Sequence, residues 1–304
     1  MLFTMGWIRQ ATRVKNGPSA RMFLWMARIA WVLVALCAPW WSLADGRSLA
    51  VSIALQAWGW GVWLIVGASL LVPTPASLTA IRITIPVIVA QSIAVIWHGD
   101  PTQNAFLQAC AVAGAVVTWR LSYHATVVDE MVQGGAYGQE MRFALRTPWP
   151  HVLPAIVAWL LFVGSLSVGT LLLSARQWIA GIILTAVGVF LVRTVPKRIH
   201  RLSRRWLVLV PAGIVLHDHM VLAETMMLRR HNITFLNVVD GPGEEADLTG
   251  GVLGPRLVVG ARNADKVILT PIAARLLKTG EALHVQSFAI APRRRDIAYA
   301  TMTS

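Results

Sequence analysis

The sequence predicts an α-helical integral membrane bundle of six transmembrane helices, joined to a small, mainly β cytoplasmic domain at the C-terminus. Three observations predict this fold class. Of the 304 residues, 56% are hydrophobic and 13% are charged, whereas a soluble domain carries about 25% charged residues. The apolar residues concentrate before residue 196, while 24 of the 41 charged residues follow it. Six segments before residue 196 are also long and apolar enough to cross a bilayer as helices.

These patterns divide the chain into three parts. Residues 1–21 form a basic cytoplasmic N-terminal segment, residues 22–195 the six-helix transmembrane domain, and residues 196–304 the β-rich domain with a short basic tail. Crossing a hydrocarbon core of about 30 Å takes roughly 20 apolar residues in a helix. The six predicted helices span residues 22–41, 48–72, 76–97, 104–119, 151–174 and 177–195.

The one sizeable cytoplasmic loop covers residues 120–150. Residues 120–133 are predicted to continue the fourth helix until Gly134 and Gly135 end it. Residues 139–146 read as a short amphipathic helix, which can lie on the membrane surface or pack on the C-terminal domain. We favour packing on the domain.

The basic residues predict the orientation in the membrane. Only Arg47 and Arg176 fall on one side of the six helices. Fourteen fall on the other side: Arg9, Arg13, Lys15, Arg21, Arg82, Arg120, Arg142, Arg146, Arg193, Lys197, Arg198, Arg201, Arg204 and Arg205. The positive-inside rule therefore predicts a multi-pass protein of a bacterial plasma membrane with both termini in the cytoplasm. A cleaved signal peptide ending near residues 42–44 is an alternative, but its apolar run exceeds the usual length of a signal core.

After residue 195 the pattern becomes that of short strands between turns. Strands are predicted at residues 206–210, 213–217, 221–228, 233–239, 257–259, 267–269 and 282–290. Glycines at several intervening positions are typical of turns. Seven short strands in roughly 100 residues predict a small sandwich or barrel. Residues 293–295 begin a tail that we expect to be mobile.

Charged groups inside the predicted helices are few. Arg28, Arg82 and Arg193 lie toward the cytoplasmic ends, where long side chains reach the headgroups. No Asp, Glu, Lys or His falls near the middle of a span, and Gln56 and Gln91 are the notable polar residues. A glutamine in a span usually bonds to a neighbouring helix. The absence of buried carboxylates argues against a proton-coupled transporter and against a membrane hydrolase.

The metal-like string is His217-Asp218-His219, whose two histidines share one face if the segment is a strand. A zinc site needs a third and usually a fourth ligand, and His231 and Asp240 lack a diagnostic spacing. A polar turn explains the string equally well, so no metal site is predicted.

Other candidate chemistry in the sequence is weak. His124, Asp129 and Glu130 combine acid and base groups, yet a solvated helix end is the simpler interpretation. Residues 247–254 are glycine-rich but lack the lysine of a phosphate-binding loop. Cys37 and Cys110 lie in apolar stretches, which excludes a disulfide framework. No catalytic residue and no cofactor is predicted.

The basic run after the sixth helix is the charged feature with a clear partner. It predicts contact with anionic lipid headgroups, worth about 1 kcal/mol for each basic residue near the surface. A plain stop-transfer anchor is the alternative. The net charge of +13 would also suit a nucleic-acid binder, but the charges follow the cytoplasmic flanks, so no nucleic-acid partner is predicted. The proposed lipid-contacting residues are Lys197, Arg198, Arg201, Arg204 and Arg205.

The C-terminal part resembles a known family. The stretch from Arg205 to Asp218, followed by Val221-Leu-Ala-Glu224 and by Asp247-Leu-Thr-Gly-Gly251, is similar to conserved actinobacterial transmembrane proteins over roughly residues 204–292. That family has a proline after His-Asp where this chain has His219, so the resemblance gives a metal site no support. It also implies a domain similar to bacterial pleckstrin-like domains. No activity follows from the resemblance.

The function predicted from the sequence is a non-enzymatic plasma-membrane protein. It would act as an anchor, scaffold or accessory subunit through its cytoplasmic β domain, with the bilayer, a membrane-protein partner or a second copy of itself as partners. One alternative is a transporter, channel or lipid-handling subunit, which a polar cavity would favour. Another is an enzyme acting on lipid or cell-envelope intermediates, which a cluster of acidic and histidine side chains near His124 and Asp129 would favour.

Overall fold

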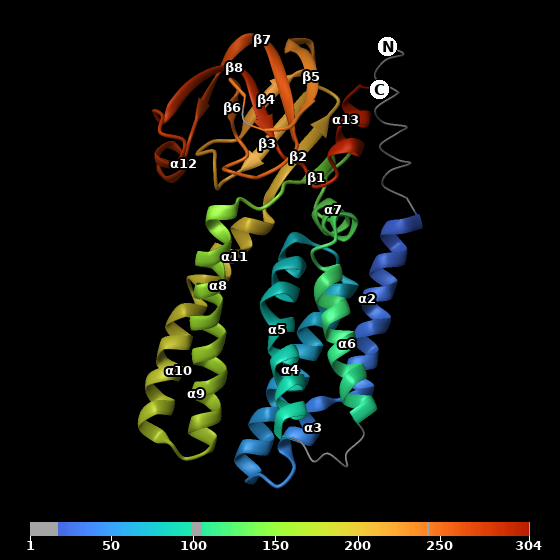
Figure 1. Ribbon diagram of the computed structural model, residues 1–304, viewed down its shortest axis with the longest axis vertical. Helices are drawn as coiled ribbons and strands as arrows, with labels where there is room; N and C mark the ends of the chain where they lie inside the picture. The colour runs from blue at the N-terminus through green and yellow to red at the C-terminus, as the bar shows by residue number, and fades with distance from the viewer. Residues whose placement is uncertain (1–17, 99–104, 242, 304) are drawn as a thin grey trace. The chain divides into compact units, whose positions relative to one another are not determined.

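The computed structural model describes residues 18–98, 105–241 and 243–303 (Figure 1). The predicted basic N-terminal segment up to residue 17 lies outside the described residues. The chain forms two compact units. The helical unit contains residues 19–127 and 155–199, and the β unit contains residues 128–154 together with the chain from residue 200 onward. The β unit therefore includes part of the loop that precedes the fifth predicted span.

Each of the six predicted apolar segments is helical. The elements are α2 (Pro18–Cys37), α3 (Pro39–Ala44), α4 (Leu49–Leu71), α5 (Pro75–His98), α6 (Ala105–Leu121), α8 (Val152–Trp159), α9 (Ser165–Ser174) and α10 (Trp178–Val192). A π-helical turn, Leu160–Gly164, joins α8 to α9. Within the described residues, four stretches of helix are long and apolar enough to cross a membrane, and there are up to six if each of two bent helix pairs is one span.

Side chains at one end of the helical unit bind the ends of neighbouring helices. Arg28 on α2 donates from Nε and Nη2 to the carbonyl of Leu70 in the last turn of α4, at 3.1 and 2.9 Å. Arg82 on α5 donates from Nη2 to the carbonyl of Ser122 just after α6, at 2.9 Å. The last carbonyls of a helix have no partner within the helix and carry its negative dipole end. Two arginines that were predicted to reach the headgroups thus cap neighbouring helices.

Small residues let the last two long helices approach closely. A Cβ placed on Gly169 would lie 2.5 Å from the backbone nitrogen of Thr185, and one on Gly188 would lie 2.8 Å from the backbone of Leu166. Gly181 meets the backbone of Leu173 in the same way, at 2.8 Å. Glycines at such crossings are typical of helix pairs in membranes, where van der Waals packing drives association. The helices α9 and α10 therefore form a tight antiparallel hairpin.

The β unit consists of two four-stranded sheets (Figure 1). The first has the order β1 (Met141–Ala144), β2 (Arg205–Val210), β3 (Gly213–Asp218) and β4 (Met226–Arg229), all antiparallel. The second has the order β5 (Ile233–Val239), β7 (Arg256–Ile268), β8 (Ala282–Ile290) and β6 (Ala246–Asp247). In the second sheet β6 pairs with β8 in parallel. Apolar side chains of both sheets form one core.

The strand β1 corrects one prediction. Residues 139–146 were expected to form a helix, but Met141–Ala144 pair with β2 instead. Met141, Phe143 and Leu145 alternate along the chain and all three enter the core, which is the period of a strand. The preference for packing on the domain is confirmed, whereas the predicted helix is wrong because a partner strand some 60 residues later in the chain decides the conformation.

Helix α7 (Ala125–Gln133) completes this edge of the first sheet. The predicted continuous helix over residues 120–133 is bent by 65° between α6 and α7. The side-chain oxygens of Asp129 and Gln133 accept hydrogen bonds from the backbone N–H groups of Ala144 and Arg142, at 2.9 and 2.8 Å. Two residues that are four positions apart on a helix lie about 6 Å apart along its axis. This is close to the distance between alternate residues of a strand. One face of α7 thus covers the open edge of β1.

Three further expectations about the β unit change. The strands predicted at 257–259 and 267–269 belong to the single strand β7, which has an irregular register between Gly260 and Asp265. Of residues 221–228, only those from Met226 onward form a strand. The tail expected to be mobile contains helix α13 (Arg295–Thr303), whose Ala298 and Met302 enter the core.

Candidate functional site: an apolar cavity in the helical unit

The helical unit contains a cavity of about 590 Å³ among α3, α4, α5 and the helix that runs from α8 to α9. Most of its wall is apolar, with Leu55 on α4, Val87 and Ala90 on α5, and Leu171 on α9 as examples. Arg47 and Ala175 line it at the end formed by the turns after α3 and α9. The space is partly open to the outside of the helical unit.

Irregular backbone on two facing walls creates this space. On α5, Pro86 lies inside the helix and has no N–H to donate to the preceding turn. On the opposite wall the chain forms the π-helical turn Leu160–Gly164, in which Leu160, Val163 and Gly164 line the cavity. Single π-helical turns inside helices are frequent at functional sites. A Cβ placed on Gly164 would meet nothing within 4 Å, so this glycine leaves the cavity wider than a larger residue would.

Two tryptophans fix these walls to each other. Trp159 donates from its indole nitrogen to the carbonyl of Ile83, one turn before Pro86, at 2.8 Å. Trp58 on α4 donates to the hydroxyl of Thr170 on α9, at 2.9 Å. Indole N–H groups away from water need such partners. Both tryptophans line the cavity, which is therefore bounded by bonded side chains rather than by loosely placed ones.

Two polar side chains in the wall have properties that a ligand can use. The side-chain oxygen of Gln91 is buried and has no hydrogen-bond partner among the described residues. Arg47 is exposed at the rim, where its Nε donates to the carbonyl of Leu43 at 3.0 Å. Among the described residues that line the cavity, Arg47 is the one ionisable group. The wall therefore offers polar groups that can bind a ligand.

The basic run separates into two groups. Helix α11 (Val195–Ser203) and the residue after it expose Lys197, Arg198, Arg201 and Arg204. Arg205 is different, because it begins β2 and is only 2% exposed. The structure thus places four of the five predicted lipid-contacting residues on the surface and the fifth inside the β unit.

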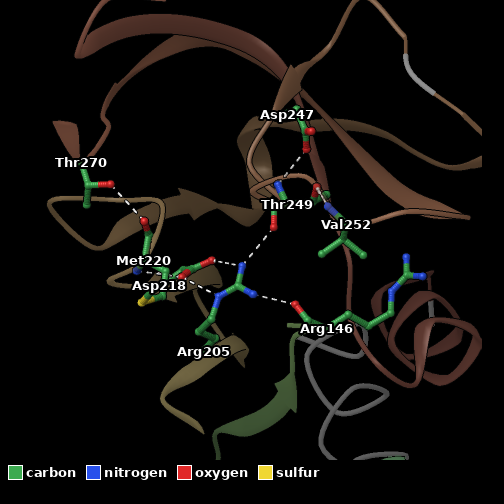
Figure 2. Close-up of polar contacts among 8 residues, drawn as sticks. All are labelled: Arg146, Arg205, Asp218, Met220, Asp247, Thr249, Val252 and Thr270. Carbon is green, nitrogen blue, oxygen red and sulfur yellow. Dashed lines mark hydrogen bonds and ion pairs between the residues drawn. The ribbon is translucent and has the colours of Figure 1, made fainter. Parts of the chain in front are cut away.

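Arg205 lies at the centre of a buried polar network (Figure 2). Its Nε and Nη2 donate to the two carboxylate oxygens of Asp218, at 2.8 and 2.6 Å. Nη1 donates to the carbonyl of Arg146 at 2.6 Å, and Nη2 also donates to that of Thr249 at 3.1 Å. A buried ion pair needs this full set of bonds to offset the desolvation of both charges. The network ties β2 and β3 to the segment after β1 and to the glycine-rich turn at residues 247–254.

The histidines of the metal-like string take a packing role. The ring of His217 stacks on Trp206 at 4.9 Å between centroids and contacts His219 at 4.3 Å. Burial, together with the nearby charges of His219, Arg204 and Arg142, lowers the pKa of His217 to about 4, so it is neutral near pH 7. Within the described ranges, no group of three or more His, Cys, Asp and Glu side chains is placed to hold a metal ion.

His124 and Asp129, which were considered for acid–base chemistry, lie in different units of the chain. His124 contacts the ring of Phe23 in the helical unit, at 4.3 Å between centroids. Asp129 accepts the hydrogen bond from the Ala144 N–H in the β unit. Neither arrangement presents a substrate-facing pair.

Sequence reasoning singled out Gln91 but not the cavity around it. Two residues in the sequence could have indicated the cavity: Pro86 within the third predicted span and Gly164 within the fifth. Each is tolerated in a membrane helix for several reasons, and only the fold shows that they face one space. No protein-family model, no curated protein and no solved structure matches this chain.

Proposed function

We propose that this chain is a non-enzymatic, multi-pass protein of the bacterial plasma membrane whose helical unit holds one membrane amphiphile. The hydrocarbon part would occupy the apolar cavity, and an anionic group would lie beside Arg47. The cavity is the observation that supports this function. Its volume of about 590 Å³ falls within the roughly 300–1,000 Å³ of ligand sites, whereas packed protein interiors contain few voids larger than a water molecule.

The pairing of β1 with β2 supports the six membrane crossings of this proposal. The register from Met141↔Leu209 to Ala144↔Trp206 requires both strands to be on the same side of the membrane. In this proposal the intervening chain would cross an even number of times, with α8–α9 and α10 as two crossings. Arg28, in the middle of α2, and Arg82, in the first half of α5, each contact the C-terminal end of a neighbouring helix or the residue just beyond it. These contacts are compatible with an antiparallel arrangement of four further spans.

The polar groups of the cavity support an amphiphile rather than a simple hydrocarbon. With both termini in the cytoplasm, the turn that carries Arg47 lies at the outer face, where an anionic headgroup would compensate its charge. Gln91 lies on the helix that forms the cavity wall, and its unpartnered oxygen can accept a hydrogen bond from a hydroxyl or amide of the ligand. Leaving such an atom unbonded costs roughly 1–3 kcal/mol, which a suitable ligand would recover.

The anchor or scaffold function predicted from the sequence is a second candidate. Strand β5 is the edge of its sheet, and Phe235 and Val238 on it are each 44% exposed. Edge strands with apolar side chains are sites for pairing with another chain. The four exposed basic residues of the run at 197–204 remain proposed contacts for anionic headgroups.

A cavity-filling variant tests the leading proposal. Gly164→Leu places a side chain in the cavity without a backbone clash, and Gly67→Leu on α4 is a matched control because its Cβ also meets nothing within 4 Å. Each protein is purified from native membranes in mild detergent, and its bound lipid is counted by native mass spectrometry. We expect the unaltered chain and Gly67→Leu to retain one lipid per chain, and Gly164→Leu to lose at least ten-fold, about 1.4 kcal/mol in affinity.

The identity of the bound lipid tests the role of Arg47. Arg47→Gln should leave the amount of bound lipid similar but lower its anionic fraction, because the apolar contacts remain. The proposal fails if the unaltered chain carries no lipid and takes none up from lipid nanodiscs, or if Gly164→Leu retains as much lipid as Gly67→Leu.

A further inference from the structure

A second pocket, in the β unit, has the composition of an anion site. It measures about 430 Å³ and is lined by Arg146, Pro255, Pro292, Arg293, Arg294, Arg295, Asp296 and Ile297. Four of these eight residues are arginines and one is acidic. We propose that this pocket binds a phosphate group, carried either by a lipid headgroup or by a soluble phosphate compound.

The backbone holds the arginines together. The segment after β1 runs antiparallel to the segment after β8, with Arg146 N donating to the carbonyl of Ala291 and Arg293 N to that of Ala144, both at 2.8 Å. Leu145 and Pro292 form a bridge between these hydrogen bonds. The backbone of Arg146 therefore lies beside that of Arg293 in a register fixed by hydrogen bonds, as in a sheet.

The charge of Arg146 is held in place without being neutralised by a carboxylate. Its Nη1 donates to the carbonyl of Leu253 at 3.0 Å, and its Nη2 donates to that of Pro255. Its Nε is buried and has no hydrogen-bond partner among the described residues. Burial and the nearby charge of Arg295 lower the pKa of Arg146.

Arg294 and Arg295 lie at the N-terminus of α13, where positively charged side chains are unfavourable. Arg294 accepts the first hydrogen bond of α13, from Ala298 N at 3.0 Å, and Arg295 is the first helical residue. The N-terminus of a helix carries positive partial charge and free N–H groups, so it favours anions. Asp296 pairs with Arg295 at 2.9 Å, and the carboxylate of Asp129 is 3.9 Å from Arg294. These two acids leave a net positive pocket in which a phosphate would satisfy both the guanidinium groups and the helix end.

Titration of the whole protein in detergent with two probes tests this site. Inorganic pyrophosphate stands for a soluble phosphate compound, and dioctanoyl phosphatidic acid stands for a headgroup. Binding is measured by calorimetry at low salt for the unaltered chain, for Arg294→Gln/Arg295→Gln, and for Arg262→Gln, an exposed arginine of the same unit outside the pocket. We expect the double variant to weaken binding at least ten-fold, and Arg262→Gln to leave it unchanged. Melting curves check that each variant is folded.

The two probes also separate the possible sources of the phosphate. Tighter binding of phosphatidic acid than of pyrophosphate assigns the pocket to a headgroup, and equal or weaker binding assigns it to a soluble compound. The site does not rest on the lipid cavity, so Gly164→Leu should bind pyrophosphate normally. The proposal is overturned if neither probe binds, or if the folded double variant binds as well as Arg262→Gln does.

Discussion

The carboxylate of Asp129 is buried between the edge of β1 and the arginines that precede α13. Burial raises its pKa to about 7, although the hydrogen bond from Ala144 and the charges of Arg294 and Arg293 oppose this shift. One oxygen accepts the bond from the Ala144 N–H, while the other is buried without a hydrogen bond and lies 3.9 Å from Arg294. Small changes of pH near neutrality therefore change the charge of Asp129.

This protonation makes the stability of the β unit depend on pH. Between about pH 4 and pH 7 the folded carboxyl keeps a proton that the unfolded one has lost, so stability falls as pH rises through this window and changes no further above it. The contribution is at most on the order of 4 kcal/mol, from about 1.4 kcal/mol per pKa unit. Asp129→Asn should remove this slope while retaining the acceptor for Ala144. Melting temperatures from pH 5 to pH 8 check this, and an equal slope in both proteins would contradict it.

The basic run shows that the sequence alone does not determine which of its charged side chains are exposed and which are buried. Lys197, Arg198, Arg201 and Arg204 have the exposure expected of a run of basic residues. Arg205 has the same chemistry and follows directly, but it is enclosed because Asp218 lies opposite it in the β2–β3 register. The pairing depends on strand register, and a list of charges along the chain contains no information about register.

At the scale of elements, the helices were predicted more closely than the strands. Each apolar segment predicted as a span is helical, since length and hydropathy alone identify such segments. The strand β1 was missed because its four residues also fit one turn of an amphipathic helix. The break between α6 and α7 was missed as well, because no proline or glycine marks residues 122–124.

The six crossings that we propose predict a labelling pattern that can be measured. Replacing Cys37 and Cys110 by serine gives a cysteine-free background, onto which single cysteines are placed. Gln177→Cys in the exposed turn between α9 and α10 should react with a membrane-impermeant maleimide in intact cells. Tyr137→Cys, at a position that is 85% exposed in the loop before β1, should react only after the cells are broken. Reaction of both, or of neither, in intact cells would contradict the single crossing proposed between these positions.

At the scale of the whole molecule, a long helical insertion divides the β unit. Its first strand precedes α8 and α10 in the chain, and its second strand follows them. The predicted boundary at residue 196 therefore removes β1 and α7 from the domain to which they belong. The resemblance to an actinobacterial family and to pleckstrin-like domains remains a prediction, because it concerns sequence motifs that no comparison tests.

Shortened chains test this division. Residues 196–304 alone lack Phe143, which is 2% exposed in the core, and loss of a buried phenylalanine costs about 3–5 kcal/mol. They also leave β2 as an open edge. A chain that joins residues 125–147 to residues 203–304 through a short glycine–serine linker retains all eight strands. We expect this joined chain to be soluble with a cooperative melt, and residues 196–304 to aggregate. Equal solubility and melting of both would show that β1 is dispensable.

The division of the β unit also sets the order of events during synthesis. The strand β1 leaves the ribosome first, and its partner β2 follows only after α10 has been made. Until then β1 has only α7 as a neighbour, and the apolar residues of the unfinished core remain accessible to proteases. In the proposed topology, a chain in which only one of the last two helices crosses the membrane would leave β2 on the opposite side from β1. Completion of the β unit would therefore require that these two helices cross the membrane together or not at all.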